Sequence, residues 1–494
     1  MTKNFTISLL KLLSITFLLS ISLHTERSIA QTKEPPALSA IKEAELKKDL
    51  FEMASDSMRG RRAGTLDEFR AAAWVAQQAQ EAGLEPAGDD GTYFQFFNLK
   101  RTTVSAESTI SLNGKNLEMW KEAWVTSPVE ASVKSAVTWQ KSLADTTKSL
   151  SGKVIAMDLM PPSTLPAEGM SLWVYRYALS AIRQQAGQLI KQGAAAVILV
   201  ADSTAQSQIG FFGHGFEEGK YLIEGMDAPN TKAAPVVLVS SKFKDELMKS
   251  DAQISLQLGV NIFDYPSENV IAKVPGTDSE LKNEYVLFSG HHDHDGVGVP
   301  DKEGDSIWNG ADDNATVSVA LLAIGRAWKA NPGKRSALFV WHGAEERGLL
   351  GSRYFVRHPV VKKEAIVAVL NGDMIGRNDP DSAALLGSIA PHRNSQQLVD
   401  MAMSANDELT HFKVDTSWDA EVHPEHWYFR SDHLPYAQWG IPSLMFTTLL
   451  HPDYHTPRDE PEGIDITKLT KMTKWMYGTG WKVSESTAAP ALEE

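Results

Sequence analysis

From Asn269 onward, short apolar segments alternate with helical ones, and this alternation constrains the fold more than any other feature of the sequence. Tyr285–Gly290, Ala337–Trp341 and Ile366–Leu370 have the apolar character of buried strands. Between the first two, Val317–Trp328 places its apolar residues on one face, as an amphipathic helix does. The pattern predicts an α/β fold, with a mixed, largely parallel sheet flanked by helices.

The 494 residues are enough for more than one unit of structure. Ahead of the alternating region, Ala40–Met53 and Glu68–Ala82 have helical spacing. Between residues 105 and 262 short strand-like segments alternate with helical ones, and we expect a small α/β unit there, with an aromatic loop tip at Gly210–Gly213. Its expected strands and helix are Lys153–Met157, Ala195–Val200, Ala234–Val239 and Ala181–Gln192. We therefore predict a discontinuous main domain (31–104 and 263–484), an insertion (105–262) and a flexible tail (485–494).

The N-terminus has the features of a secretory signal peptide. Lys3 is followed by an apolar stretch, Ile7–Leu23, and then by the small residues of Ser28-Ile29-Ala30. We expect cleavage after Ala30, hence an exported protein that is periplasmic or extracellular and has no membrane contact afterwards. The alternative is an uncleaved anchor helix, which Lys11 disfavours because it shortens the apolar core.

Charge and cysteine content narrow the classes of partner and site. The formal net charge is −14, which argues against nucleic acid or an anionic membrane as partner, because both require clustered Lys and Arg. The chain has no cysteine, so a metal site would have to use His, Asp and Glu.

Five segments place His or carboxylate residues at predicted strand ends or loops: Ser289–His294, Gly310–Asn314, Gly343–Glu346, Asn371–Met374 and Tyr454–Asp459. Each alone is unremarkable, since a polar strand end, a helix cap or an acidic turn has the same composition. Together they would lie at one edge of the sheet, where ligands of such folds gather. Imidazole and carboxylate without thiolate suit catalytic zinc, and cobalt or manganese would fit the same set.

Two of these segments carry neighbouring groups with separate tasks. His291 and Asp293 project to the same side of a strand, which suits a metal-binding imidazole held by a carboxylate. Glu345 and Glu346 are adjacent, so in an extended link one can bind metal while the other acts as a general base. His292 and His294 are expected to line the rim.

The five segments, in this order, closely resemble the di-zinc exopeptidases of the aminopeptidase Y, bacterial leucyl aminopeptidase and glutamate carboxypeptidase type. The resemblance runs from about Glu43 to Met476 and includes Gly60–Thr65, which is similar to the family's Gly-Arg segment. The insertion resembles a protease-associated (PA) domain, which members of the family often carry. Its matching portions are Gly152–Val154, Gly193-Ala194 and Ala234–Val237.

The resemblance implies a role for each matching residue. Metal ligands would be shared between two zinc ions: His291 and Asp373 on one, Glu346 and His455 on the other, and Asp313 bridging both. The three remaining roles would be an orienting carboxylate, a general base and an oxyanion donor: Asp293, Glu345 and Tyr454. The family often has a cis peptide after the bridging aspartate, here Asp313-Asn314.

These roles imply an aminopeptidase that hydrolyses N-terminal residues of peptides through a hydroxide bridging two zinc ions. Three alternatives stay open: a carboxypeptidase of the glutamate carboxypeptidase type, a one-zinc glutaminyl cyclase and a non-catalytic PA-domain receptor. The carboxypeptidase would need clustered arginines; the candidates are Arg326, Arg347, Arg353, Arg377, Arg430 and Arg458. The sequence gives no signal for the side-chain preference, the role of the insertion or the oligomeric state.

Overall fold

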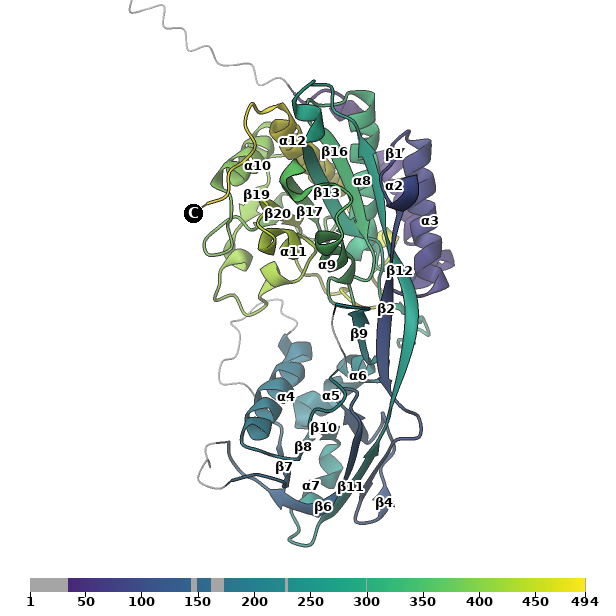
Figure 1. Cartoon of the computed structure of the whole chain (residues 1–494), viewed down its shortest axis with the longest axis vertical. Coiled ribbons are helices and arrows are strands. Elements are labelled where there is room, and N and C mark those ends of the chain that lie inside the picture. The colour runs from purple at the N-terminus through teal and green to yellow at the C-terminus, as the bar shows by residue number, and fades with distance from the viewer. Residues whose placement is uncertain (1–33, 144–148, 161–172, 227–229, 299, 494) are drawn as a thin grey trace, which may run out of the picture. The chain divides into compact units, whose positions relative to one another are not determined.

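The computed structural model describes residues 34–143, 149–160, 173–226, 230–298 and 300–493 (Figure 1). The predicted signal peptide lies outside these ranges. Within them, no helix combines the length and the apolar character that crossing a membrane requires.

The main sheet has ten strands, in the order β19-β18-β20-β17-β13-β16-β12-β2-β9, with β1 also paired to β12 (Figure 1). Their bounds are β1 Glu85–Pro86, β2 Phe94–Val104, β9 Lys220–Ile223, β12 Val260–Val274, β13 Tyr285–His291, β16 Ser336–His342, β17 Ile366–Gly372, β18 Ser382–Leu386, β19 Lys413–Asp415 and β20 Ser443–Thr447. The central strands β20, β17, β13 and β16 are parallel to one another. β12 pairs antiparallel with β16 on one side and with β2 on the other. The predicted mixed α/β sheet is confirmed.

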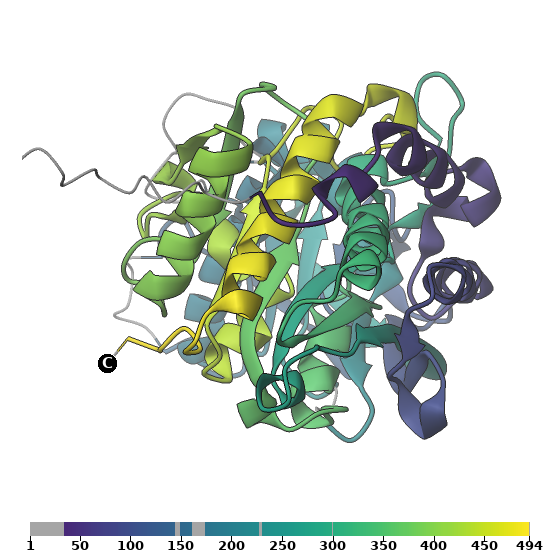
Figure 2. The same cartoon turned by 90° about the horizontal axis from the view of Figure 1, so that it is seen from above.

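Helices cover both faces of this sheet (Figure 2). Their bounds are α2 Glu43–Met53, α3 Leu66–Glu81, α8 Thr316–Ala330, α10 Gln396–Leu409 and α12 Ile466–Glu485 on one face, and α9 Leu350–Arg357 and α11 His433–Gln438 on the other. Alternation along β13 explains both layers, because Phe288 packs on Trp328 of α8 while Leu287 faces Phe355 and Tyr436. The sheet is therefore buried on both faces, and polar side chains can gather at the carboxyl ends of its strands.

A second sheet of eight strands, in the order β4-β3-β11-β6-β7-β8-β10-β5, forms a separate unit (Figure 1). Its strands are β3 Thr109–Leu112, β4 Lys115–Asn116, β5 Ala123–Val125, β6 Ala131–Trp139, β7 Val154–Asp158, β8 Ala196–Val200, β10 Val236–Val239 and β11 Gln253–Leu258. Its helices are α4 Trp173–Lys191, α5 Ser203–Phe212, α6 His214–Glu218 and α7 Lys244–Leu247. We refer to it as the inserted unit.

The inserted unit is joined to the main sheet by β2 and β12, which pair along their length from Val104↔Val260 to Phe94↔Val270. One strand from within residues 105–262, β9, pairs with β2 in the main sheet. The segment that contains α6 and β9 thus belongs to both units. It brings residues of the insertion beside the main sheet.

One sequence prediction about local structure is wrong. Gly210–Gly213 is not a loop tip, because its first three residues end α5, a helix that Asp202 caps by accepting a hydrogen bond from Ala205 N at 2.7 Å. Near the C-terminus, Ala491 N donates to Gln397 Oε1 at 2.9 Å, and Glu493 N donates to the Asn394 carbonyl at 2.8 Å.

Candidate metal centre

The five polar segments meet at the carboxyl edge of the parallel strands. His291 ends β13, Asp373 follows β17, and Glu345 and Glu346 follow β16. These three strands are neighbours in register, with His291 opposite His342 at the end of β16. Parallel strands bring their carboxyl ends to one edge, so residues far apart in sequence become adjacent there.

One group of ligand-type side chains forms around His291. Its Nε2 lies 3.2 Å from Asp313 Oδ1 and 3.8 Å from Asp373 Oδ1. All three side chains are buried. One ligand atom from each lies close enough to the others to surround a single cation.

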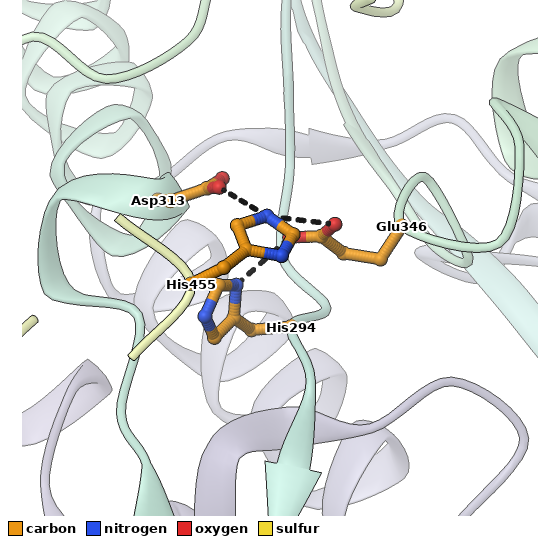
Figure 3. A group of neighbouring side chains, drawn as sticks. All are labelled: His294, Asp313, Glu346 and His455. Carbon is orange, nitrogen blue, oxygen red and sulfur yellow. Dashed lines mark hydrogen bonds and ion pairs between the residues drawn. The ribbon is translucent and has the colours of Figure 1, made fainter. Parts of the chain in front are cut away.

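A second group forms around His455 (Figure 3). Its Nε2 lies 3.1 Å from Asp313 Oδ2 and 3.3 Å from Glu346 Oε2. Asp313 therefore presents one carboxylate oxygen to each histidine and is common to both groups. This is the arrangement that a carboxylate shared by two cations requires.

The residues present fit divalent cations. His291 Nε2 and His294 Nε2 are buried and, within the described residues, have no hydrogen-bond partner. Buried polar atoms normally have one, so these nitrogens have spare capacity to bind a ligand. The donor atoms are imidazole nitrogens and carboxylate oxygens, the set that catalytic zinc takes when thiolate is absent.

The surroundings of the carboxyl groups in the site shift their pKa values in different directions. Burial raises the pKa of the Glu345 and Asp373 carboxyls. Burial would also raise the pKa of Asp313, but the adjacent imidazoles of His291 and His455 hold it well below its usual range. Asp313 is thus kept as an anion between the two histidines, while Glu345 is well suited to hold a proton.

Glu345 lies at the edge of the first group, with its Oε2 3.9 Å from His291 Nε2. Asp293 fixes the turn that carries it, because its carboxylate accepts hydrogen bonds from Glu345 N at 2.9 Å and Glu346 N at 3.3 Å. The imidazole of His291 meets Asp293 mainly through the main chain, with Nδ1 3.2 Å from the carbonyl oxygen and 3.7 Å from Oδ1. The Asp293 side chain therefore positions both glutamates besides lying near His291.

Tyr454 packs directly on the second group. Its ring centroid is 4.0 Å from that of His455 and 6.0 Å from that of Trp427. It is half-buried, so part of its side chain is exposed beside the second group.

Asp459, in the segment Tyr454–Asp459, helps to hold the backbone around Asp313. Asp459 Oδ2 accepts hydrogen bonds from Asp312 N at 3.0 Å and Asp313 N at 3.1 Å. Asn314 Nδ2 donates to the Gly372 carbonyl at 3.1 Å. The peptide bond between Asp313 and Asn314 is cis, which confirms the expectation from the sequence.

The prediction that His292 and His294 line the rim is wrong, because both are fully buried. Burial lowers the pKa of His292 to about 4, and its Nε2 lies 3.8 Å from Glu268 Oε1. His294 Nδ1 lies 2.8 Å from Glu346 Oε1, so its ring lies beside the other side chains of the second group (Figure 3). A polar run after a strand predicts exposure, and only the tertiary partners of these rings reveal otherwise.

Arg61, from the Gly60–Thr65 segment, ties the loops of the site together. It is fully buried and donates to four main-chain carbonyls: those of His292 at 2.8 Å, Met53 at 3.1 Å, Asn309 at 2.6 Å and Gly310 at 2.9 Å. Burial lowers its pKa to about 10. The carbonyls of His292 and Gly310 lie close in sequence to His291 and Asp313. The Arg61 guanidinium therefore holds together the two segments that contain these residues.

Replacing Arg61 with methionine should lower the free energy of unfolding by about 3 kcal/mol, since it leaves several buried carbonyls without donors. The measurement is thermal or urea unfolding of the metal-free protein. Arg59→Met is the matched control: Arg59 is half-exposed and, among the described residues, pairs only with Asp67, so a change within about 0.5 kcal/mol is expected. Equal stability of the two variants would remove this role from Arg61.

Comparison with known proteins gives three findings. Residues 269–479 match peptidase family M28. Aminopeptidase YwaD of Bacillus subtilis is 28% identical over 167 residues, which cover 32% of this chain and 34% of YwaD. The chain thus matches about a third of the length of this curated relative.

Two solved structures share the fold. The aminopeptidase from Aneurinibacillus sp. strain AM-1 aligns with a TM-score of 0.60 and 18% identity, over 92% of this chain and 97% of that one. BSAP, a zinc aminopeptidase from Bacillus subtilis, aligns with a TM-score of 0.58 and 18% identity, over 91% and 97%. The likeness covers the inserted unit as well as the main sheet.

Proposed function

Because residues 269–479 match peptidase family M28, we propose that the chain is an exported zinc aminopeptidase that releases N-terminal residues from peptides. One observation carries the proposal: Asp313 places one oxygen beside His291 and the other beside His455, at the shared corner of two ligand groups. Two zinc ions per chain are proposed on this ground. The leader at residues 1–30 supports export to the periplasm or the medium.

His291, Asp313 and Asp373 would hold one ion, and Asp313, Glu346 and His455 would hold the other. When bound, zinc polarises a peptide carbonyl and lowers the pKa of a water molecule towards neutrality. Glu345 would accept the proton of the attacking water and deliver it to the leaving amine, a task that its raised pKa suits. Tyr454, packed on His455, would donate a hydrogen bond to the developing oxyanion.

The arginines favour an aminopeptidase over a carboxypeptidase. A carboxypeptidase of the glutamate carboxypeptidase type needs arginines available for a terminal carboxylate. Five of the six candidates are already paired with carboxylates of the chain: Arg326 with Asp49, Arg347 with Glu218, Arg377 with Asp453, Arg430 with Glu425 and Arg458 with Asp453. Paired guanidinium groups of this kind would have to be released before they could bind a substrate carboxylate.

The ligand groups also disfavour the other two alternatives. A glutaminyl cyclase with one zinc would not need the second group around His455, and a receptor would not need Glu345. Here both groups and a buried Glu345 are present together.

The proposal predicts hydrolysis of aminoacyl chromogenic substrates but not of N-blocked peptides, and loss of that activity with a chelator. The measurements are initial rates on both substrate sets, and zinc per chain by elemental analysis, with two expected. Restoring zinc should restore the activity. Equal cleavage of N-blocked peptides, or full activity in the chelator, would contradict the proposal.

A further inference from the structure

The inserted unit reaches the candidate metal centre through one carboxylate. Glu218, the last residue of α6, is buried and lies between two arginines of the main domain. Its Oε2 accepts a hydrogen bond from Arg347 Nη1 at 2.8 Å, and its Oε1 pairs with Arg62. The side chains of Glu218 and Arg347 are each only 9% exposed, so this pair is largely withdrawn from water.

The contacts continue from Arg347 to a proposed metal ligand. Arg347 Nη2 lies 3.3 Å from Asp295 Oδ1, and Asp295 Oδ2 lies 2.8 Å from His455 Nδ1. His455 in turn faces Asp313 through Nε2 at 3.1 Å. A row of alternating charges therefore runs from the inserted unit to the shared corner of the two ligand groups.

The contact at His455 Nδ1 has a defined chemical consequence. A ring N–H donated from Nδ1 to a carboxylate fixes the tautomer in which Nε2 keeps its lone pair for a metal. Asp295 also carries a second partner, Arg347, which holds the carboxylate in place from its other oxygen. Its position thus depends on Arg347, whose own position depends on Glu218.

The same residues form a wall of a cavity of about 290 Å³. This cavity is bordered by both units, and the residues that it shares with the row of charges are Glu218, Asp295, Arg347 and His455; the proposed ligand Glu346 also lines it. The link is therefore at the entrance to the second ligand group, not at a remote point of the interface.

We propose that Glu218 of the inserted unit, acting through Arg347 and Asp295, positions His455 to bind its zinc ion. The inference rests on the proposed function, because it takes His455 as a zinc ligand. Glu218 and Asp295 are positioning residues, and through Glu218 the inserted unit contributes to zinc affinity. A plain docking contact would instead stabilise the interface and leave zinc affinity unchanged.

The test compares zinc retention in the full-length protein across a series of buffered chelator concentrations. Asp295→Asn should weaken the more labile zinc about tenfold to a hundredfold, as loss of a carboxylate behind a histidine ligand does. Glu218→Ala should weaken the same ion about threefold to tenfold, and Glu218→Gln less, because an amide still accepts a hydrogen bond from Arg347. The double variant Glu218→Ala/Asp295→Asn should lose no more than Asp295→Asn alone.

Glu224→Ala is the matched control. Glu224 also joins the inserted segment to the main sheet, through Lys100 at 3.0 Å, but contacts no proposed ligand. Wild-type zinc affinity is expected for it.

Wild-type zinc affinity in Glu218→Ala would overturn the inference, as would additive losses in the double variant. A Glu218→Ala protein that only melts earlier when metal-free, with unchanged zinc affinity, would reduce the contact to docking and equally overturn it. Failure of the proposed function has a different signature: the wild-type protein itself would bind no zinc and hydrolyse no peptide.

Discussion

Glu345→Gln is expected to keep the zinc content of the wild-type protein and to lower kcat by about 10²- to 10⁴-fold, the range for loss of a general base. The amide has the size of the carboxylate but cannot accept the proton of the attacking water. Glu345 does not take part in the contacts between Asp313, His455 and Glu346, so its loss should leave both ligand groups intact. The measurements are kcat on an aminoacyl substrate and zinc per chain.

Glu364→Gln is the matched control, because it makes the same replacement of a carboxylate by an amide at an exposed position of the main domain. It should retain full activity. Two results would remove the general-base role from Glu345: normal hydrolysis by Glu345→Gln, or an activity loss accompanied by an equal loss of zinc. The second result would make Glu345 a ligand, since one of its carboxylate oxygens also lies near ligand atoms of His291 and Glu346.

Local patterns were sufficient for much of the fold. The apolar runs that become β13, β16 and β17 and the helical spacing of α8 indicate burial, because the period at which apolar residues recur shows which faces of an element are buried. Gly210–Gly213 failed as a prediction because Gly and Phe suggest a loop, whereas the cap at Asp202 starts a helix that runs through to Phe212. The cap carries the more decisive local signal.

The ligand-type residues were also predictable, because they stand in polar segments at strand ends or loops, and the resemblance to di-zinc exopeptidases implied their roles. The residues that support them were not. Asp295 pairs with His455 from 160 positions away in sequence, and Glu218 pairs with Arg347 across 129. No periodicity encodes such contacts, and a lone Glu at the end of a short helix has the same sequence signature as a solvated one. The burial of Arg61 and His294 could not be predicted for the same reason.

Asp313→Asn is expected to have the largest effect on the metal site. Asp313 contributes one oxygen to each ligand group, and an amide offers one neutral oxygen and an NH₂ that faces a cation unfavourably. Both ions should bind weakly, so the purified variant is expected to hold less than one zinc per chain and to be inactive. Elemental analysis and titration with zinc in a buffered chelator provide the measurement.

A stability measurement separates weak binding from misfolding. Zinc that binds only the folded wild-type protein should stabilise it by about 4 kcal/mol at a thousandfold excess over Kd, and Asp313→Asn should lose most of this increment. Its metal-free form should unfold much as the metal-free wild type does, because the hydrogen bond from Asp313 N to Asp459 involves only the main chain of residue 313. Asp407→Asn, an exposed change on α10, should keep both zinc content and the increment. If Asp313→Asn instead held two zinc ions, the two ligand groups would not share this residue, and a metal pair around it would have to be abandoned.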